Sequence, residues 1–318
     1  MNALLLAAVL ATTRGVLVAQ SGSLALYDRT AANVIWTSDG VQTPARIIAS
    51  NDQAAIIDSL ANQVRIVDLG SGRGTTMQTG ETPIDGAFVN RRLYLLERDA
   101  RALERIGTDG ARASIGIAAD PAFLRVANSR LYVYGRADGV LQEISSSPFA
   151  IGRSLALPPF ASDLEIDGKN AYLVYPRTAK IAMVSIASMK KSGEVAVGAV
   201  PVDIALASRG LAVADPSAKR VWVIEGQESF AQAFARGFLR GLLGLGLSSQ
   251  RNSDFPTGVD RVIVQGSRLY AYDSSSGTLY RSARAIAKSV APEGFSIGPG
   301  GVYVWDDTVR RLQRLEER

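Results

Sequence analysis

The sequence lacks two residue types that carry much of protein chemistry, because its 318 residues include no cysteine and no histidine. Without cysteine, disulfide frameworks, thiolate metal sites and cysteine nucleophiles are excluded. Without histidine, Ser-His-Asp triads, histidine general bases and histidine-ligated metals are excluded as well. Acid–base chemistry would fall to Asp, Glu, Lys or Tyr, which need stronger pKa tuning to act near neutral pH.

Charged residues are somewhat sparse at 20% of the chain, and hydrophobic residues make up 47%, a composition typical of a globular protein. The formal net charge is only +5, with 29 Arg and 6 Lys. A nucleic-acid-binding face needs concentrated basic residues with aromatic residues between them. The densest basic cluster consists of four arginines with two glutamates among them: Arg310, Arg311, Arg314, Glu316, Glu317 and Arg318. We therefore expect no nucleic-acid partner.

No apolar run approaches the ~18 residues that span a bilayer. An apolar run of nine residues, Ala3–Ala11, has the length of the hydrophobic region of a signal peptide. This interpretation predicts an extracytoplasmic or periplasmic protein, although no basic residue precedes the run and Leu17-Val18-Ala19 is a poor cleavage site. In the alternative, residues 4–11 are the inner strand of a first repeat unit, and the protein is cytoplasmic.

An internal repeat is the strongest pattern in the chain. In each copy, four apolar or alternating residues rich in Tyr, Val and Leu are often followed by Asp or Glu. The eight copies are Val16–Ala19, Ala54–Asp58, Leu93–Glu97, Leu131–Tyr134, Ala171–Tyr175, Leu211–Asp215, Leu269–Asp273 and Val302–Asp306. Successive copies begin 38, 39, 38, 40, 40, 58 and 33 residues apart. Such regular spacing is typical of a repeat architecture.

Further runs surround each copy. A second run begins ten residues after the start of the copy in seven units, as in Val221–Ile224, and eight residues after it in the first unit. Polar, Gly-containing turns such as Asp273–Gly277 join the two runs, which predicts a β-hairpin. A third run, usually preceded by Pro as in Pro201 before Ile204–Ala207, lies before the hairpin, and a weaker fourth run often follows.

Four short strands per ~40 residues predict a β-propeller blade. We therefore predict an all-β fold: a β-propeller of four-stranded blades within one domain, residues 1–318. Eight repeat units indicate eight blades, with seven as the alternative. A β-sandwich also has many short strands, but it does not predict a phrase that returns at a fixed spacing.

One unit carries a resemblance to a known family. Pro201–Ala207, Gly210–Asp215 and Arg220–Ile224 resemble a unit of the bacterial YVTN/NHL-type β-propellers, and the similarity covers most of the chain at repeat level. The resemblance implies a propeller but no single function, because that superfamily includes lactonases, lyases, sensor domains and adaptors. Its lyases are expected to use histidine, which this chain lacks, and its lactonases need converging Glu, Asn and Asp metal ligands.

The longest interval between copies indicates an insertion, residues 226–254, between units six and seven. Here the apolar period changes from about two residues to about four, which predicts an amphipathic helix. One face carries Phe230, Phe234, Phe238 and Leu242, and another carries Gln232, Arg236 and Arg240. The helix either packs on the propeller's own rim, docks into a partner's groove or lies at a membrane surface.

Charged residues recur near the start of the predicted inner strand in five units. They are Arg46, Asp85, Asp163, Asp203 and Asp260, at matching or nearly matching repeat positions. Equivalent positions in a propeller lie on a ring about its axis, so we expect these residues at the mouth of a central channel. Converging carboxylates there would bind a divalent cation or a cationic ligand. In the simpler interpretation, each Asp accepts hydrogen bonds from backbone donors of a turn or of the next blade.

We therefore expect a non-catalytic propeller scaffold that binds a protein or a small ligand, with partner or peripheral membrane docking through the inserted helix. The missing imidazole favours binding over catalysis. The alternative is a propeller hydrolase or lyase, lactonase-like and dependent on a divalent metal, with its site at the channel mouth. We assign no catalytic residue, no metal ligand and no cofactor, apart from the divalent cation of that alternative; the sequence does not indicate an oligomeric state.

Overall fold

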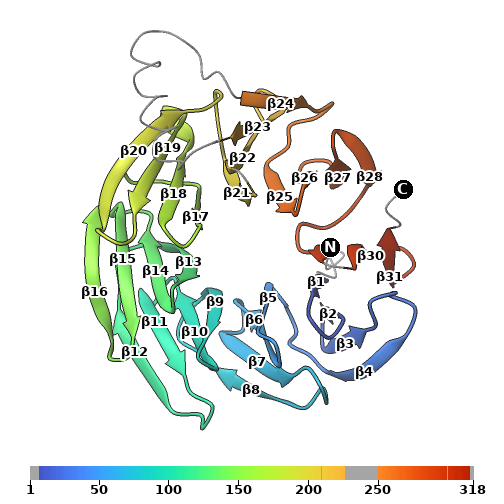
Figure 1. The fold of residues 1–318 in the computed structure, drawn as a ribbon. Helices are drawn as coiled ribbons and strands as arrows, with labels where there is room; N and C mark the ends of the chain where they lie inside the picture. Colours follow the sequence, from blue (N-terminus) through green and yellow to red (C-terminus); the bar gives the residue numbers. More distant parts are fainter. Residues whose placement is uncertain (1–6, 209, 226–249, 299, 316–318) are drawn as a thin grey trace, which may run out of the picture. The chain divides into compact units, whose positions relative to one another are not determined.

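The computed structural model describes residues 7–208, 210–225, 250–298 and 300–315 (Figure 1). The chain divides into two compact parts, which are described separately. The first part comprises residues up to Leu124, Ser145–Ile151 and the residues from Val290 onward. The second part comprises Arg125–Ile144 and Gly152–Ser289.

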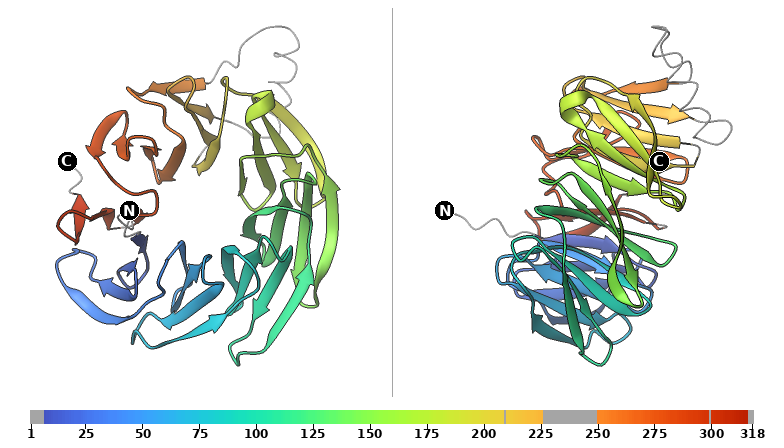
Figure 2. Two further views of the ribbon diagram at one scale, coloured as in Figure 1. Left: turned by 180° about the vertical axis from the view of Figure 1, so that it is seen from behind. Right: turned by 90° about the vertical axis from the view of Figure 1, so that its left-hand side faces the viewer.

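The described residues form an all-β propeller of eight antiparallel sheets, or blades, whose strands follow one another in chain order (Figures 1 and 2). Blade 1 contains β1 (Ala8–Ala11), β2 (Val16–Gln20), β3 (Ser23–Tyr27) and β4 (Val34–Asp39). Blade 2 contains β5 (Arg46–Ala49), β6 (Gln53–Asp58), β7 (Gln63–Asp68) and β8 (Gly74–Gln78). Blade 3 contains β9 (Pro83–Val89), β10 (Arg92–Glu97), β11 (Ala102–Ile106) and β12 (Arg112–Gly116).

Blades 4 to 7 follow the same four-stranded plan, whereas blade 8 has three strands among the described residues. Blade 4 contains β13 (Pro121–Ala127), β14 (Arg130–Gly135), β15 (Val140–Ser146) and β16 (Phe149–Ala156). Blade 5 contains β17 (Asp163–Ile166), β18 (Asn170–Tyr175), β19 (Lys180–Ser185) and β20 (Lys190–Ala196), with a 3-10 turn, η1 (Pro176–Thr178). Blade 6 contains β21 (Asp203–Ala207), β22 (Gly210–Asp215), β23 (Arg220–Glu225) and β24 (Gln250–Asp254). Blade 7 contains β25 (Arg261–Gln265), β26 (Arg268–Asp273), β27 (Thr278–Arg281) and β28 (Arg284–Ala287), and blade 8 contains β29 (Phe295–Gly298), β30 (Gly301–Asp306) and β31 (Arg311–Leu315).

These sheets confirm the fold class and the count of eight repeat units. The eight copies of the repeated phrase are the second strands of the blades. Five of the six residues of β6, β10, β14, β18 and β22 are buried. Because both faces of such a strand are covered by the neighbouring blades, its sequence is a continuous apolar run instead of an alternating one.

The hydrophobic core lies where successive blades pack on one another. In the first part, Leu17, Ile47 and Ile56 belong to one buried cluster drawn from blades 1 and 2. In the second part, Tyr172, Met183 and Ile204 belong to a cluster drawn from blades 5 and 6. A blade has little core of its own, so burial against its neighbours supplies the stabilisation, about 1.5–3 kcal/mol for each large apolar side chain.

The acidic residue that ends many of the second strands has a structural role. Asp215 is fully buried and accepts hydrogen bonds from Ala199 N (2.7 Å), Ser217 Oγ (2.7 Å) and Ala218 N (3.1 Å). Burial alone would raise the pKa of Asp215, but these hydrogen bonds outweigh it and lower the pKa. The carboxylate therefore joins the turn after its own strand to the loop that precedes its blade. Glu97 occupies the same place in blade 3.

The structure describes the last part of the N-terminal apolar run and the last part of the predicted insertion. Residues 8–11 form β1, the inner strand of blade 1, where Val9 N donates to Glu293 O at 2.8 Å within the first part. The predicted helix falls on residues 226–249, which lie outside the described residues. Residues 250–254, which the sequence analysis places in the insertion, form β24 and complete blade 6. In the described part of the chain, no helix is long and apolar enough to cross a membrane.

Candidate ligand-binding site

In the first part, the predicted channel residues Arg46 and Asp85 form an ion pair, with Arg46 Nε 3.0 Å from Asp85 Oδ1. The Asp85 carboxylate also accepts from Gly86 N at 2.8 Å and from Leu124 N, in the next blade, at 3.2 Å. The Asp85 side chain is 5% exposed, whereas that of Arg46 is 44% exposed. Asp85 is therefore engaged by backbone and by Arg46, and the guanidinium is the group that reaches solvent.

In the second part, Asp163 and Asp203 repeat this arrangement. Asp163 accepts from Leu164 N at 2.8 Å, from Ile204 N of the next blade at 3.1 Å, and from Arg125 Nη2 at 3.3 Å. Asp203 accepts from Val262 N of the next blade at 2.7 Å. Each inner-strand carboxylate thus fastens its own blade to the following one.

The carboxyl groups of Asp163 and Asp203 are close enough to influence one another. Burial raises the pKa of Asp203 well above its ordinary value, and the charge of Asp163 and a hydrogen bond with it raise the pKa further. The backbone N–H of Val262 and the charge of Arg261 act in the opposite direction. Because a like charge at close range disfavours the ionised form, Asp203 holds its proton to a higher pH than an ordinary aspartate.

Asp260 does not occupy the position of the other acids. In the strand register, Arg261 pairs with Tyr272 in the way that Asp203 pairs with Ala214, so Arg261 is the equivalent residue. Asp260 instead accepts hydrogen bonds from the backbone N–H (3.1 Å) and the hydroxyl of Ser274. Its role is to hold the turn after β26.

The metal interpretation of these acids stays a prediction. Within the described ranges, no group of three or more Asp or Glu residues is arranged to hold a metal ion. The other predicted site residues are those of the inserted helix, and they lie outside the described residues: Phe230, Phe234, Arg236, Phe238, Arg240 and Leu242. Docking through them also stays a prediction.

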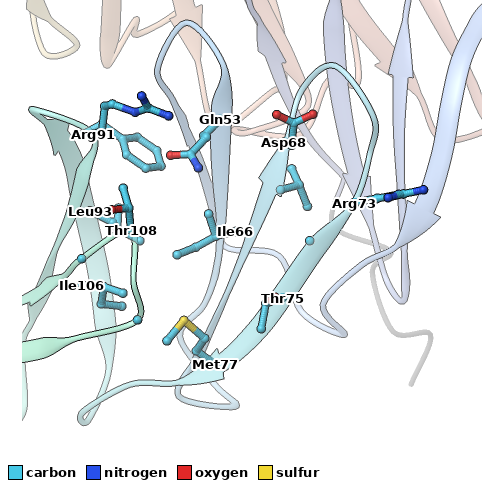
Figure 3. Close-up of a pocket in the computed structure, with 15 residues that line it drawn as sticks. Gln53, Ile66, Asp68, Arg73, Thr75, Met77, Arg91, Leu93, Ile106 and Thr108 are labelled. Atoms are coloured by element: carbon cyan, nitrogen blue, oxygen red, sulfur yellow. The ribbon is translucent and has the colours of Figure 1, made fainter.

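A pocket that the sequence analysis did not predict lies in the first part, between blades 2 and 3 (Figure 3). Its volume is about 470 Å³. The apolar wall is formed by residues that also pack against the core between the two blades: Ile66, Met77, Phe88, Leu93 and Ile106. This volume lies in the range of small-molecule sites, which are mostly apolar with a few polar groups that orient the ligand.

The polar groups of the first pocket lie around its mouth. Figure 3 shows Arg91, from the turn before β10, and Gln53, from the start of β6, on the same side of the pocket and pointing toward one another. Among the described residues, the Arg91 guanidinium has no hydrogen-bond or ion-pair partner. Asp68 lies on the other side, but its carboxylate accepts from Gly70 N (3.1 Å) and from the backbone N–H and hydroxyl of Ser71, both at 2.8 Å.

The electrostatics of this mouth favour an anion. The hydrogen bonds of Ser71 are the main cause that lowers the pKa of Asp68, so this carboxylate stays ionised and belongs to its own turn. The two positive charges of Arg91 and Arg73 exceed the single negative charge of Asp68. Arg91 also has unused N–H donors beside the apolar wall. A guanidinium with free N–H groups binds a carboxylate or phosphate through two parallel hydrogen bonds.

No protein-family model and no curated protein matches the chain. The resemblance to YVTN/NHL-type repeats and the bacterial source therefore stay predictions.

Solved structures do resemble the chain. A streptogramin B lyase matches with a TM-score of 0.59 at 12% identity, covering 82% of this chain and 89% of the lyase chain. The virginiamycin B lyase of Staphylococcus aureus matches with a TM-score of 0.61 at 14% identity, covering 89% of this chain and 94% of the lyase chain. The hydrazine synthase of Kuenenia stuttgartiensis matches with a TM-score of 0.65 at 13% identity, covering 88% of this chain and 96% of that chain. Identities this low show a shared propeller fold, on which each protein carries its own site.

Proposed function

We propose that the chain is a non-catalytic propeller scaffold that binds a small amphiphilic anion in the pocket between blades 2 and 3. The observation that carries the proposal is a pocket of about 470 Å³ with an apolar wall. Among the described residues, the guanidinium of Arg91 at its mouth has no hydrogen-bond or ion-pair partner. An apolar ligand body would cover Ile66, Met77 and Leu93, and its anionic head would lie at Arg91. Gln53 would donate a further hydrogen bond to the same head group.

Two contributions of similar size support this ligand class. Removal of apolar surface from water contributes about 25 cal/mol per Å², so a chain of several methylene groups supplies a few kcal/mol. A hydrogen bond to a charged group contributes about 1.5–3 kcal/mol. Neither alone accounts for selective binding, because the wall accepts any apolar body and the guanidinium accepts any anion.

The test is calorimetric titration with octanoate, octanol and butyrate. We expect octanoate to bind more tightly than octanol, which lacks the charge, and than butyrate, which lacks the apolar length. In the Arg91→Gln variant, the affinity for octanoate should fall by about tenfold to about a hundredfold, the equivalent of one charged hydrogen bond. The affinity for octanol should not change.

Arg92→Gln is the matched control, because Arg92 is the adjacent exposed arginine and does not line the pocket. The proposal fails if octanoate and octanol bind equally, or if Arg91→Gln and Arg92→Gln weaken octanoate binding to the same extent.

We also propose, as a separate activity of the scaffold, docking to a protein or a membrane through the segment 226–249. Its support is the sequence pattern alone, in which Phe and Leu occupy one helical face and Arg the other. Deletion of residues 229–249 should abolish binding to liposomes or to a captured partner without changing the octanoate affinity. Unchanged binding would contradict this activity.

A further inference from the structure

A second pocket lies in the second part, between blades 4 and 5, with a volume of about 650 Å³. It occupies the same place in the repeat as the first pocket. Arg130 is the first residue of β14, as Gln53 is of β6. Glu143 pairs with Tyr132 across β14 and β15, as Ile66 pairs with Ala55 across β6 and β7. At this point of the wall a charged residue, Glu143, therefore stands where the first pocket has the apolar Ile66.

Glu143 forms the centre of this wall. Its side chain is only 3% exposed, and Arg130 Nη1 lies 2.9 Å from its Oε1. Arg153 Nη2 binds the other oxygen, Oε2. Two guanidiniums thus face one buried carboxylate, which leaves an excess of positive charge.

The two arginines differ in how many of their N–H donors remain free to bind a ligand. Arg153 reaches from blade 4 to blade 5, where its Nη1 donates to Ala187 O at 2.7 Å and its Nη2 to Ile186 O at 2.9 Å. Arg153 is therefore held in place by several contacts. The Arg130 side chain is 49% exposed, and its one ion pair with Glu143 uses a single nitrogen. Its remaining N–H donors are available at the pocket surface.

The other carboxylate of the pocket is also engaged. Asp167 accepts from Lys169 N at 2.8 Å, from Asn170 N at 2.7 Å and from the Tyr172 hydroxyl at 2.7 Å. The Lys169 ammonium is exposed and, among the described residues, has no hydrogen-bond or ion-pair partner. Both acids are thus satisfied, whereas two cations, Arg130 and Lys169, keep open donors toward the same space.

We propose that this second pocket binds a small polyhydroxylated anion, with its carboxylate or phosphate group between Arg130 and Lys169. The surrounding amides and hydroxyl of Asn128, Asn170 and Ser185 would bind the hydroxyl groups. Because Glu143 and its two arginines stand where the first pocket has an apolar residue, a polar ligand body would find hydrogen-bonding groups at this point of the wall. The two pockets would then select different anions with the same repeat position.

The test is calorimetric titration of the whole protein with glucose 6-phosphate, gluconate and glucose. We expect at least one of the two anions to bind about tenfold or more tightly than glucose, which carries the hydroxyl groups without the charge. Binding of glucose 6-phosphate alone assigns a phosphate ligand, and binding of gluconate alone assigns a carboxylate. The affinity should fall when the salt concentration rises from about 20 mM to about 200 mM, because the cations are partly exposed.

Two variants connect the binding to the pocket. Lys169→Gln removes an exposed charge, and Arg130→Gln leaves Glu143 paired with Arg153. Each should weaken binding of the anion by about threefold to about thirtyfold, a loss between that of an exposed ion pair and that of a hydrogen bond to a charged group. Lys288→Gln, which alters an exposed lysine outside the pocket, and Arg91→Gln, in the first pocket, should leave it unchanged.

Three results would overturn the proposal: neither anion binds, glucose binds as tightly as the anions, or Lys169→Gln and Lys288→Gln have the same effect. None of these results bears on the octanoate site. Failure of the first pocket likewise leaves the second one standing, since the two are probed by different ligands and variants.

Discussion

Glu97 in blade 3 should make the protein less stable as the pH rises toward neutrality. Glu97 is 3% exposed and accepts a hydrogen bond from Gly80 N at 2.6 Å. Glu104, on the neighbouring strand β11, is 6% exposed and accepts a hydrogen bond from Arg112 Nε at 2.6 Å. Burial is the main cause that raises the pKa of Glu97 from an ordinary value of 4.5 to about 7, and the charge of Glu104 adds to it.

The sign and size of the effect follow from proton binding. Between pH 4.5 and about 7, the folded protein holds a proton on Glu97 that the unfolded chain has released. Over that window the free energy of unfolding falls by about 1.4 kcal/mol per pH unit from this group, or about 3 kcal/mol in all. The Glu97→Gln variant cannot ionise, and its side-chain oxygen still accepts the Gly80 hydrogen bond. Its advantage over the wild type should therefore grow by about 3 kcal/mol between pH 4.5 and pH 8.

The assay is equilibrium unfolding in urea, followed by tryptophan fluorescence at intervals across that pH range. Titrating groups that do not interact with Glu97 contribute equally to both proteins and cancel in the difference. Glu81→Gln, which alters an exposed glutamate in the loop before the same blade, is the control for the removal of a carboxylate that is not buried. A Glu97→Gln difference that is flat, or that shrinks as the pH rises, would refute the reasoning.

Three further predictions concern the stability of the fold and are measured by the same unfolding assay. Asp203→Ala should lower the free energy of unfolding by about 1–3 kcal/mol because the buried Val262 N–H loses its acceptor. Asp203→Asn keeps an acceptor and cannot ionise, so it should leave the stability at pH 7 almost unchanged. Equal losses in the two variants would contradict the hydrogen bond between blades. Asp215→Ala should lower the free energy of unfolding by a similar amount at pH 7. Because the folded-state pKa of Asp215 is lowered, that loss should shrink as the pH falls below 3.8. A loss that does not change with pH would show that the ionised carboxylate does not stabilise the fold. Ile56→Ala, at a fully buried position of the cluster from blades 1 and 2, should cost about 2–5 kcal/mol, and a cost below about 1 kcal/mol would mean that the site collapses on the cavity.

The strand pattern was predictable from sequence because each blade repeats the same burial. The second strand is covered on both faces in every unit, so its apolar run survives as a recognisable phrase, and the turn residues at fixed offsets complete the hairpin. The acidic residue exemplified by Asp215 was recognisable in the sequence for the same reason, since it recurs at the end of the second strand in several units.

The strand register and the pockets were harder to predict from the sequence. The sequence places Asp260 at a nearly matching repeat position, but the strand pairing shows that Arg261, one residue later, takes the inner-strand position. The pocket residues were missed because each pocket combines turns and strands of two units, and its chemistry differs from one place to the next. Only the pairing of strands reveals that Ile66 and Glu143 occupy equivalent positions.

The inner-strand carboxylates have a consequence for synthesis of the chain on the ribosome. The backbone N–H groups that bind Asp85, Asp163 and Asp203 lie 39, 41 and 59 residues further along the chain. At a translation rate of about 5–20 residues per second, a carboxylate waits roughly 2–8 s for a partner ~40 residues away to be made. Each newly formed sheet therefore stays incomplete at one side until its successor emerges, and the nascent protein matures in a fixed order from its first blade to its last.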